Sequence, residues 1–189
     1  FTTAVLRSKT VGIVGLGSIG REVARLANAF GMKVVATRRS AKRVTRARYV
    51  DIVLPREQLS QLLSDSDFVV LTLPLTSETK RLIGEEELKA MKSTAYLINV
   101  ARGSIVDEEA LIRALDEHWI AGAGLDVFAT EPLPAESKLW EFPNVIFSPH
   151  VAGNMEDYNI RATEIFTENL RRYLNGEKLR NVVDKKKGY

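Results

Sequence analysis

Three side chains that could act together on one substrate each follow a short apolar run: Arg102, Glu131 and His150. If these runs are parallel strands, their carboxyl ends meet at one edge of a sheet, where open α/β sheets bind ligands. Reduction of a ketone by hydride transfer suits this set of groups. Histidine titrates near neutrality and can donate a proton to the carbonyl oxygen. A neighbouring carboxylate favours the imidazolium and orients the ring, and an arginine can bind a substrate carboxylate and polarise the carbonyl.

Each of these residues also has a plain structural explanation. Arg102 could be a surface charge, Glu131 the start of a turn, and His150 a histidine at a strand end. The other histidine of the sequence, His118, lies in a polar turn that leads into a strand. We interpret His118 as structural.

A glycine-rich stretch at residues 15–20, GLGSIG, matches the pattern G-x-G-x-x-G of dinucleotide-binding proteins. It follows an apolar run and precedes a helix predicted over residues 19–30. Gly15 permits the tight turn, Gly17 lets the backbone approach a pyrophosphate, and Gly20 allows close packing of helix and strand. The free N–H groups and positive dipole end of the helix would bind the phosphates, whereas a plain glycine-rich turn is the structural alternative. The loop residues predicted to bind the nucleotide are Gly15, Gly17, Ser18, Ile19 and Gly20.

A run of cations follows the second predicted strand, with no acid between Glu22 and Asp51. In NAD-binding folds an acid about 20 residues after the loop binds the ribose 2′-hydroxyl, and a carboxylate there would repel a 2′-phosphate. Guanidinium groups bind a phosphate through charge-assisted hydrogen bonds. Arg38, Arg39 and Ser40 therefore predict a 2′-phosphate pocket and NADP as the cofactor, with NAD as the alternative. The other interpretation, a solvated basic loop, is the one we apply to Arg43, Arg46 and Arg48.

The composition is that of an ordinary globular chain. With 189 residues, of which 45% are hydrophobic, it is long enough for one large domain with a sizeable core. A net charge of +3 does not indicate a polycation built for nucleic acid. The absence of cysteine rules out disulfides and thiolate chemistry and fits a reducing compartment. No apolar run approaches the roughly 20 residues of a membrane span, so we expect a cytoplasmic protein without a membrane or nucleic-acid partner.

Apolar runs alternate with helical periodicities along the chain. Strands are predicted at residues 11–14, 33–36, 68–71, 95–99, 123–127 and 145–147, with a further short apolar segment at 51–54. Helices are predicted at residues 19–30, 107–115 and 155–175, with a helical turn after Pro55. This alternation predicts an α/β fold with a doubly wound parallel sheet, a Rossmann-type dinucleotide-binding domain.

Taken together, the motifs resemble those of the D-isomer-specific 2-hydroxyacid dehydrogenases, from about Leu6 to the C-terminus. The resemblance rests on VGIVGLGSIG (11–20), LPLT (73–76), INVARG (98–103), LDVF (125–128), EPL (131–133) and SPH (148–150). It implies that Arg102 binds the substrate carboxylate, that His150 is the general acid/base and that Glu131 is its partner. The cofactor contacts that it adds are Asp126 at the nicotinamide carboxamide, Leu73 and Pro74 at the adenine, and Thr79, Val100 and Gly153. Two departures are Arg38, where many relatives have aspartate, and Thr72, where many have histidine.

The resemblance further implies hydride transfer between NADP(H) and a small 2-oxo or 2-hydroxy acid of the D series, such as glyoxylate or hydroxypyruvate. Because the resemblance extends to transcriptional co-repressors, a dinucleotide-sensing binding protein without turnover is the alternative. Family members carry a substrate domain built mostly from sequence before the glycine loop. We therefore expect residues 1–178 to form the dinucleotide-binding domain and residues 179–189 a tail that returns to a substrate domain missing from this chain. A homodimer is also expected, partly from the resemblance and partly from the apolar and aromatic stretch 139–143.

Overall fold

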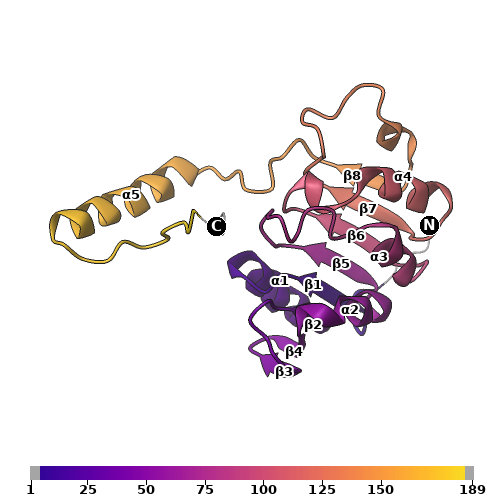
Figure 1. Cartoon of the computed structure of the whole chain (residues 1–189), viewed down its shortest axis with the longest axis horizontal. Coiled ribbons are helices and arrows are strands. Elements are labelled where there is room, and N and C mark those ends of the chain that lie inside the picture. The colour runs from indigo at the N-terminus through magenta and orange to yellow at the C-terminus, as the bar shows by residue number, and fades with distance from the viewer. Residues whose placement is uncertain (1–4, 186–189) are drawn as a thin grey trace.

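The computed structural model describes residues 5–185 as alternating strands and helices (Figure 1). Residues 1–4 and 186–189, at the outer ends of the predicted domain and tail, lie outside the described residues. The strands are β1 (Thr10–Val14), β2 (Lys33–Thr37), β3 (Thr45–Ala47), β4 (Val50–Leu54), β5 (Phe68–Leu71), β6 (Tyr96–Asn99), β7 (Gly122–Leu125) and β8 (Val145–Phe147). The α-helices are α1 (Ser18–Ala29), α2 (Leu59–Asp65), α3 (Glu85–Ala90), α4 (Glu108–Asp116) and α5 (Tyr158–Leu174).

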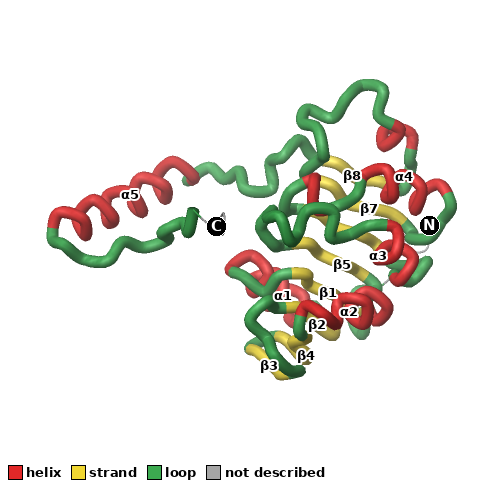
Figure 2. Tube along the Cα trace, viewed as in Figure 1, coloured by secondary structure: helices red, strands yellow, loops and turns green. Residues whose placement is uncertain are grey.

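The eight strands of the described residues form one sheet in the order β3-β4-β2-β1-β5-β6-β7-β8, and Figure 2 shows them in yellow. Every neighbouring pair is parallel except the antiparallel pair of β3 and β4. From β1 the chain winds outward through β2 and β4, and then returns to the other side of β1 at β5. The carboxyl ends of β1 and β5 therefore form the point at which the strand order reverses, the usual ligand crevice of an open α/β sheet. The predicted doubly wound sheet is confirmed.

Alternate residues of the buried strands point to opposite faces, and each face has its own helices. On one face α1 packs through Ala24 and Ala27 against Ile13 and its neighbours. On the other face α2, α3 and α4 pack against the strands, with Leu62 and Leu88 completely buried. Burial on both faces explains why these strands read as continuous apolar runs rather than as alternating patterns. No helix within residues 5–185 is long and apolar enough to cross a membrane.

Helix α5 does not pack on the sheet but projects to one side of the domain (Figure 1). The periodicity correctly predicts this helix, although it begins at Tyr158 rather than near residue 155. Its apolar side chains are exposed, with Phe166 at 66% and Tyr173 at 72%, and none of its residues is buried. A periodic pattern indicates that a helix has an apolar face, but it does not say what that face packs against.

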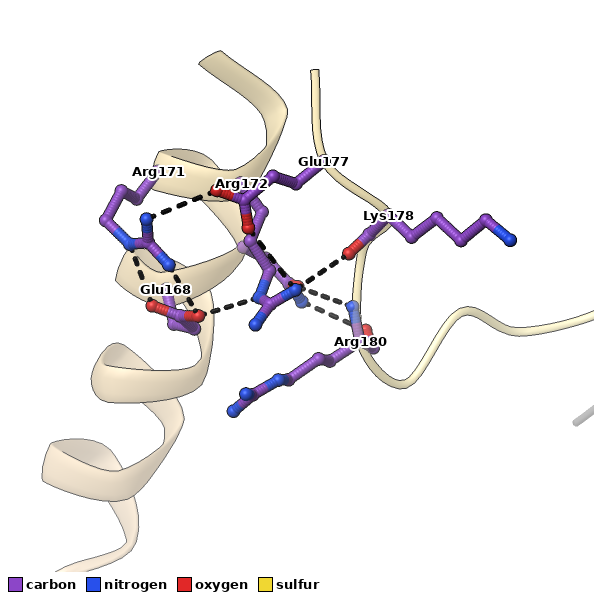
Figure 3. A network of polar contacts seen from close by, with 7 residues as sticks. Glu168, Arg171, Arg172, Glu177, Lys178 and Arg180 are labelled. Atoms are coloured by element: carbon purple, nitrogen blue, oxygen red, sulfur yellow. Dashed lines mark hydrogen bonds and ion pairs between the residues drawn. The ribbon is translucent and has the colours of Figure 1, made fainter. Parts of the chain in front are cut away.

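A polar network fastens the C-terminal turns of α5 to the segment that follows them (Figure 3). Glu168 accepts hydrogen bonds from Arg171 at 3.0 Å and from Arg172 at 2.7 Å, and these bonds lower the pKa of Glu168 to about 2. Asn169 donates to the Arg180 carbonyl at 3.1 Å and accepts from the Arg180 N–H at 2.8 Å. The start of the predicted tail is thus held along α5.

Strand β3 and helix α3 were not predicted from the sequence. Strand β3 is three residues long, exposed throughout and carries Arg46, so it shows no apolar signal. Helix α3 has six residues and begins with Glu85, Glu86 and Glu87, and this length is too short for a clear period. The Glu87 carboxylate accepts the Gly84 N–H at 3.0 Å and caps the helix.

Candidate dinucleotide and catalytic site

A cavity of about 410 Å³ lies at the carboxyl ends of β1, β2 and β5, where the strand order reverses. Its walls come from the glycine loop, the basic turn after β2 and the segment after β5. Of the residues predicted to bind the cofactor, it brings together Gly15, Gly17, Arg38, Arg39, Ser40, Leu73, Pro74 and Thr79. Segments far apart in the sequence therefore share one pocket, as the doubly wound topology requires.

The glycine loop leaves the N-terminus of α1 open toward this cavity. Gly15 has a φ of +102°, and a Cβ there would lie 2.9 Å from the Leu73 Cβ, so only glycine fits without strain. Gly17 is the N-cap residue of α1, and no side chain among residues 5–185 caps it. A Cβ on Gly17 would meet no atom within 4 Å. Open space beside free N–H groups at a helix N-terminus fits the pyrophosphate of a dinucleotide.

The basic wall is built by a turn that begins where β2 ends. The Arg38 N–H donates to the Leu54 carbonyl at 3.1 Å, and the Ala41 N–H donates to the Arg38 carbonyl at 3.0 Å. Arg38, Arg39 and Ser40 are exposed at the rim of the cavity, where a 2′-phosphate on the adenosine ribose could contact them. Arg38 and Ser40 also border a second cavity of about 290 Å³, which has further cations. These further cations are Lys42, Arg43 and Arg46.

The opposite wall is shaped by the loop after β5. The Thr79 hydroxyl donates to the Pro74 carbonyl at 2.7 Å and accepts the Thr76 N–H at 2.7 Å. Thr79 thus holds the loop that carries Leu73 and Pro74 against the cavity. At the rim, Arg56 and Glu78 form an ion pair at 2.5 Å that joins the loop before α2 to the loop after β5. This pair was not predicted, because nothing in the sequence separates it from ordinary surface charges.

His150 and Glu131 meet outside this cavity, past the ends of β8 and β7. His150 Nδ1 lies 2.8 Å from Glu131 Oε2, and Glu131 Oε1 accepts the Phe128 N–H at 3.0 Å. These hydrogen bonds, that of His150 first, lower the pKa of Glu131, with smaller contributions from the charges of His150 and Arg102. The two side chains that the resemblance pairs, Glu131 and His150, thus lie within hydrogen-bonding distance, and the charge of Arg102 acts on the same carboxyl.

Arg102 stands on a loop that a buried side chain shapes. The Asn99 side chain donates to the Arg102 carbonyl at 3.1 Å and accepts the Ala101 N–H at 3.0 Å. Among residues 5–185, the exposed Arg102 guanidinium donates only locally, to the Ala101 carbonyl at 2.6 Å. An arginine held this way is available to a carboxylate ligand.

Gly103 joins the Arg102 loop to the segment that carries Glu131. A Cβ on Gly103 would lie 1.9 Å from both the carbonyl carbon and the oxygen of Phe128. The two backbones are therefore in direct contact, and this contact places the guanidinium near the carboxylate. Gly103 stands in the motif INVARG, but its contact with Phe128 is not readable from sequence.

Asp126 is buried at 4% exposure and holds the loop around His150. Its carboxylate accepts the Ser148 hydroxyl at 2.6 Å and the N–H groups of Val151 at 2.8 Å and Ala152 at 2.9 Å. Burial opposes the charge, but these hydrogen bonds outweigh it and keep the pKa of Asp126 below its ordinary value. In this structure the Asp126 carboxylate accepts hydrogen bonds from its own loop. The contact to the nicotinamide that the resemblance implies stays a prediction.

His150 has a left-handed backbone with a φ of +55°, uncommon for a residue other than glycine.

The remaining residues predicted to bind the cofactor do not line the cavity. Gly20 is buried behind the loop, Ser18 and Ile19 are exposed in the first turn of α1, Val100 packs beside the α1 face, and Gly153 is exposed after β8.

Residues 1–152 match the sequence profile of the D-isomer specific 2-hydroxyacid dehydrogenase, NAD binding domain. The chain belongs to this family. Curated relatives include a glyoxylate reductase of Thermococcus gammatolerans, 46% identical over 177 residues, and one of Aeropyrum pernix, 44% identical over 180 residues. These alignments cover 94% and 95% of this chain but only 52% and 53% of the relatives. The chain thus spans about half the length of the curated family members that it matches.

Solved structures of family members share the fold of the whole chain. One is a D-isomer specific 2-hydroxyacid dehydrogenase from Xanthobacter autotrophicus Py2 in complex with NADPH and MES, with a TM-score of 0.88 and 38% identity, covering 100% of this chain and 76% of that one. Another is an NADPH-dependent glyoxylate/hydroxypyruvate reductase from Sinorhizobium meliloti in complex with NADP and sulfate, with a TM-score of 0.90 and 32% identity, covering 100% of this chain and 60% of that one.

Proposed function

We propose that the protein to which this chain belongs transfers a hydride between NADP(H) and a small 2-oxo or 2-hydroxy acid, with this chain as its cofactor-binding half. The observation that carries the proposal is the contact of 2.8 Å between His150 and Glu131, with Arg102 beside it. This group stands at the carboxyl edge of the same sheet as the glycine loop. One edge therefore offers both a dinucleotide site and the groups for ketone reduction.

Each of the three side chains has a distinct role in this proposal. Bound NADPH would supply the hydride. His150 gives a proton to the carbonyl oxygen through Nε2, because its Nδ1 is engaged by Glu131. Glu131 fixes the ring and balances the positive charge of the protonated imidazole. Arg102 binds the substrate carboxylate through its guanidinium and orients the carbonyl toward His150.

The choice of NADP rests on the basic turn after β2. Arg38, Arg39 and Ser40 stand at the cavity rim, and no carboxylate follows β2 where an NAD-binding acid would accept the ribose hydroxyl. The relatives from Xanthobacter autotrophicus and Sinorhizobium meliloti are described with NADPH and NADP. Guanidinium groups in that position favour the phosphorylated cofactor.

The substrate is proposed to be glyoxylate or hydroxypyruvate. Support comes from the names of the relatives, which are glyoxylate reductases and a glyoxylate/hydroxypyruvate reductase. We further propose residues 1–178 as the cofactor domain and residues 179–189 as the start of a return to a substrate domain. Because that second domain would enclose the substrate and exclude water, residues 1–189 alone should turn over 2-oxo acids poorly.

We also propose a homodimer that uses the segment 139–143. Only part of this segment is available for contact, since Leu139 is fully buried in the core while Trp140 is 50% exposed. The Trp140 ring packs edge-on against Phe147 at 4.9 Å between centroids, which gives the surface a rigid aromatic feature. Light scattering that shows a monomer at high concentration would remove this proposal.

The direct test of function is NADPH oxidation by the full-length protein with glyoxylate or hydroxypyruvate. The expected result is turnover by the unmodified protein that falls by roughly 10²–10⁴-fold in His150→Ala while NADPH still binds. Binding of NADPH without turnover of any 2-oxo acid would contradict the proposed hydride-transfer activity and favour a dinucleotide-sensing protein.

A further inference from the structure

One residue of the chain holds two consecutive carbonyls at the end of β1. The Thr72 N–H donates to the Val14 carbonyl at 3.0 Å, and the Thr72 hydroxyl donates to the Gly15 carbonyl at 2.6 Å. Thr72 directly follows β5 and lines the cavity at the point where the strand order reverses. The first bond continues the ladder between β1 and β5, whereas the second belongs to the side chain alone.

The peptide group between Gly15 and Leu16 is therefore fixed from both sides. Its oxygen accepts the Thr72 hydroxyl after β5, and its N–H, that of Leu16, donates to the Thr37 carbonyl at the end of β2 at 3.2 Å. Glycine at a φ of +102° has little conformational preference of its own, so external bonds must select the orientation of this peptide. The next residue along the loop is Gly17, the N-cap of α1.

Gly20 of α1 packs closely behind the loop and the Thr72 hydroxyl. A Cβ on Gly20 would lie 2.3 Å from the Gly15 oxygen and 2.8 Å from the Thr72 hydroxyl oxygen. Helix, loop and hydroxyl are thus in close contact on the side of the loop that faces α1. Loss of the hydroxyl would leave the Gly15 carbonyl without that bond and the loop freer to move.

We propose that Thr72 is a positioning residue for the pyrophosphate: its hydroxyl sets the orientation of the Gly15–Leu16 peptide and so aims the N–H groups of the loop and of α1. This inference rests on the proposed dinucleotide binding. The glycine loop and the basic wall should respond differently to loss of the hydroxyl. The basic wall at Arg38 is anchored to the Leu54 carbonyl rather than to Thr72. Ligands that contain a pyrophosphate should depend on the hydroxyl, and a ligand held by the basic wall alone should not.

The test uses calorimetric titration of residues 1–189 with NADPH, NADH and adenosine 2′-monophosphate. Thr72→Val keeps the shape of the side chain and removes the hydroxyl, while Thr72→Ser keeps the hydroxyl. We expect the valine variant to bind both dinucleotides roughly tenfold more weakly, the loss typical of one hydrogen bond with an unsatisfied partner. Its affinity for adenosine 2′-monophosphate should stay within about twofold of the unmodified chain, and the serine variant should restore the dinucleotide affinities.

Two results would overturn the inference. One is a valine variant that binds NADPH as the unmodified chain does, and the other is an equal loss for adenosine 2′-monophosphate, which would indicate general damage. If the valine variant fails to fold, Thr72→Ala replaces it in the same comparison. An unmodified chain that binds neither dinucleotide would instead overturn the proposed function itself, so the two failures are distinguishable.

Discussion

Replacement of Gly103 by alanine tests whether the backbone contact between Gly103 and Phe128 positions the proposed catalytic side chains, Arg102, Glu131 and His150. The added Cβ would lie 1.9 Å from the Phe128 carbonyl, whereas ordinary contact begins at 3.4 Å, so the two backbones must separate by about 1.5 Å. Overpacking of this kind costs roughly 1–3 kcal/mol. For a domain of this size we expect a melting temperature lower by about 2–12 °C, at roughly 2–4 °C for each kcal/mol.

The displacement of Phe128 should also move Glu131 and His150. The Phe128 N–H binds Glu131, and Glu131 binds His150, so a shift of Phe128 moves the carboxylate away from Arg102. Misplacement by about 1 Å can reduce a rate roughly 100-fold, and we expect that loss of kcat/KM in the full-length enzyme. Affinity for NADPH should change little, because neither Gly103 nor Phe128 lines the cofactor cavity.

The matched control is Gly124→Ala, the same chemical change on β7. A Cβ at Gly124 would come no closer than 3.7 Å to Ile98, which is ordinary contact. This variant should melt close to the unmodified chain and keep its kinetics. If Gly103→Ala melts as the control does and retains kcat/KM, the backbone contact does not position Arg102 and Glu131.

Three further outcomes are expected from the charges of the structure. In the full-length enzyme, Glu131→Gln should lower kcat/KM, because the hydrogen bond that orients the His150 ring loses its carboxylate, and it should leave NADPH affinity nearly unchanged; an unchanged kcat/KM would show that Glu131 is not the partner of His150. His150→Ala should lower kcat/KM at every pH measured, typically by 10²–10⁴-fold, and a pH-independent rate near that of the unmodified enzyme would exclude it as the general acid. Because the pKa of Glu168 is lowered from 4.5 to about 2, its contribution is fully present above pH 4.5 and is lost as the pH falls toward 2. The protection of the Arg180 amide against exchange, taken relative to the intrinsic rate at each pH, should fall over that range, and in Glu168→Gln it should already be low at neutral pH; protection that ignores both changes would refute the role of the network.

Much of the fold could be predicted from the sequence because parallel strands buried on both faces leave continuous apolar runs. Those runs, with Gly31 ending α1 at a φ of +74°, were enough to give the doubly wound sheet. The antiparallel strand β3 was missed because it is short, exposed and charged. Helix α5 was recognised by its period, but its exposed apolar face could not be foreseen, since periodicity carries no information about a packing partner.

At the site, the types of the functional residues could be predicted from the sequence, but the contacts that position them could not. Arg102, Glu131 and His150 could be chosen because their residue types suit ketone reduction, and their pairing and roles were implied by the family resemblance. The contacts of Gly103 and of the Thr72 hydroxyl could not be foreseen, because they depend on which backbone atoms come within reach across the sheet edge. Backbone contacts of this kind leave no residue-type pattern.

The most direct measurement is the affinity of residues 1–189 for NADPH and for NADH, determined by calorimetric titration of both cofactors at one salt concentration. A charge-assisted hydrogen bond contributes roughly 1.5–3 kcal/mol, so one such bond to the 2′-phosphate should make NADPH bind at least about tenfold more tightly. Arg38→Ala should remove most of that preference, whereas the control Arg48→Ala should keep it, because Arg48 lines neither cavity and stacks on Tyr49. Equal affinities of the unmodified chain for the two cofactors would contradict an NADP-binding site at Arg38, Arg39 and Ser40.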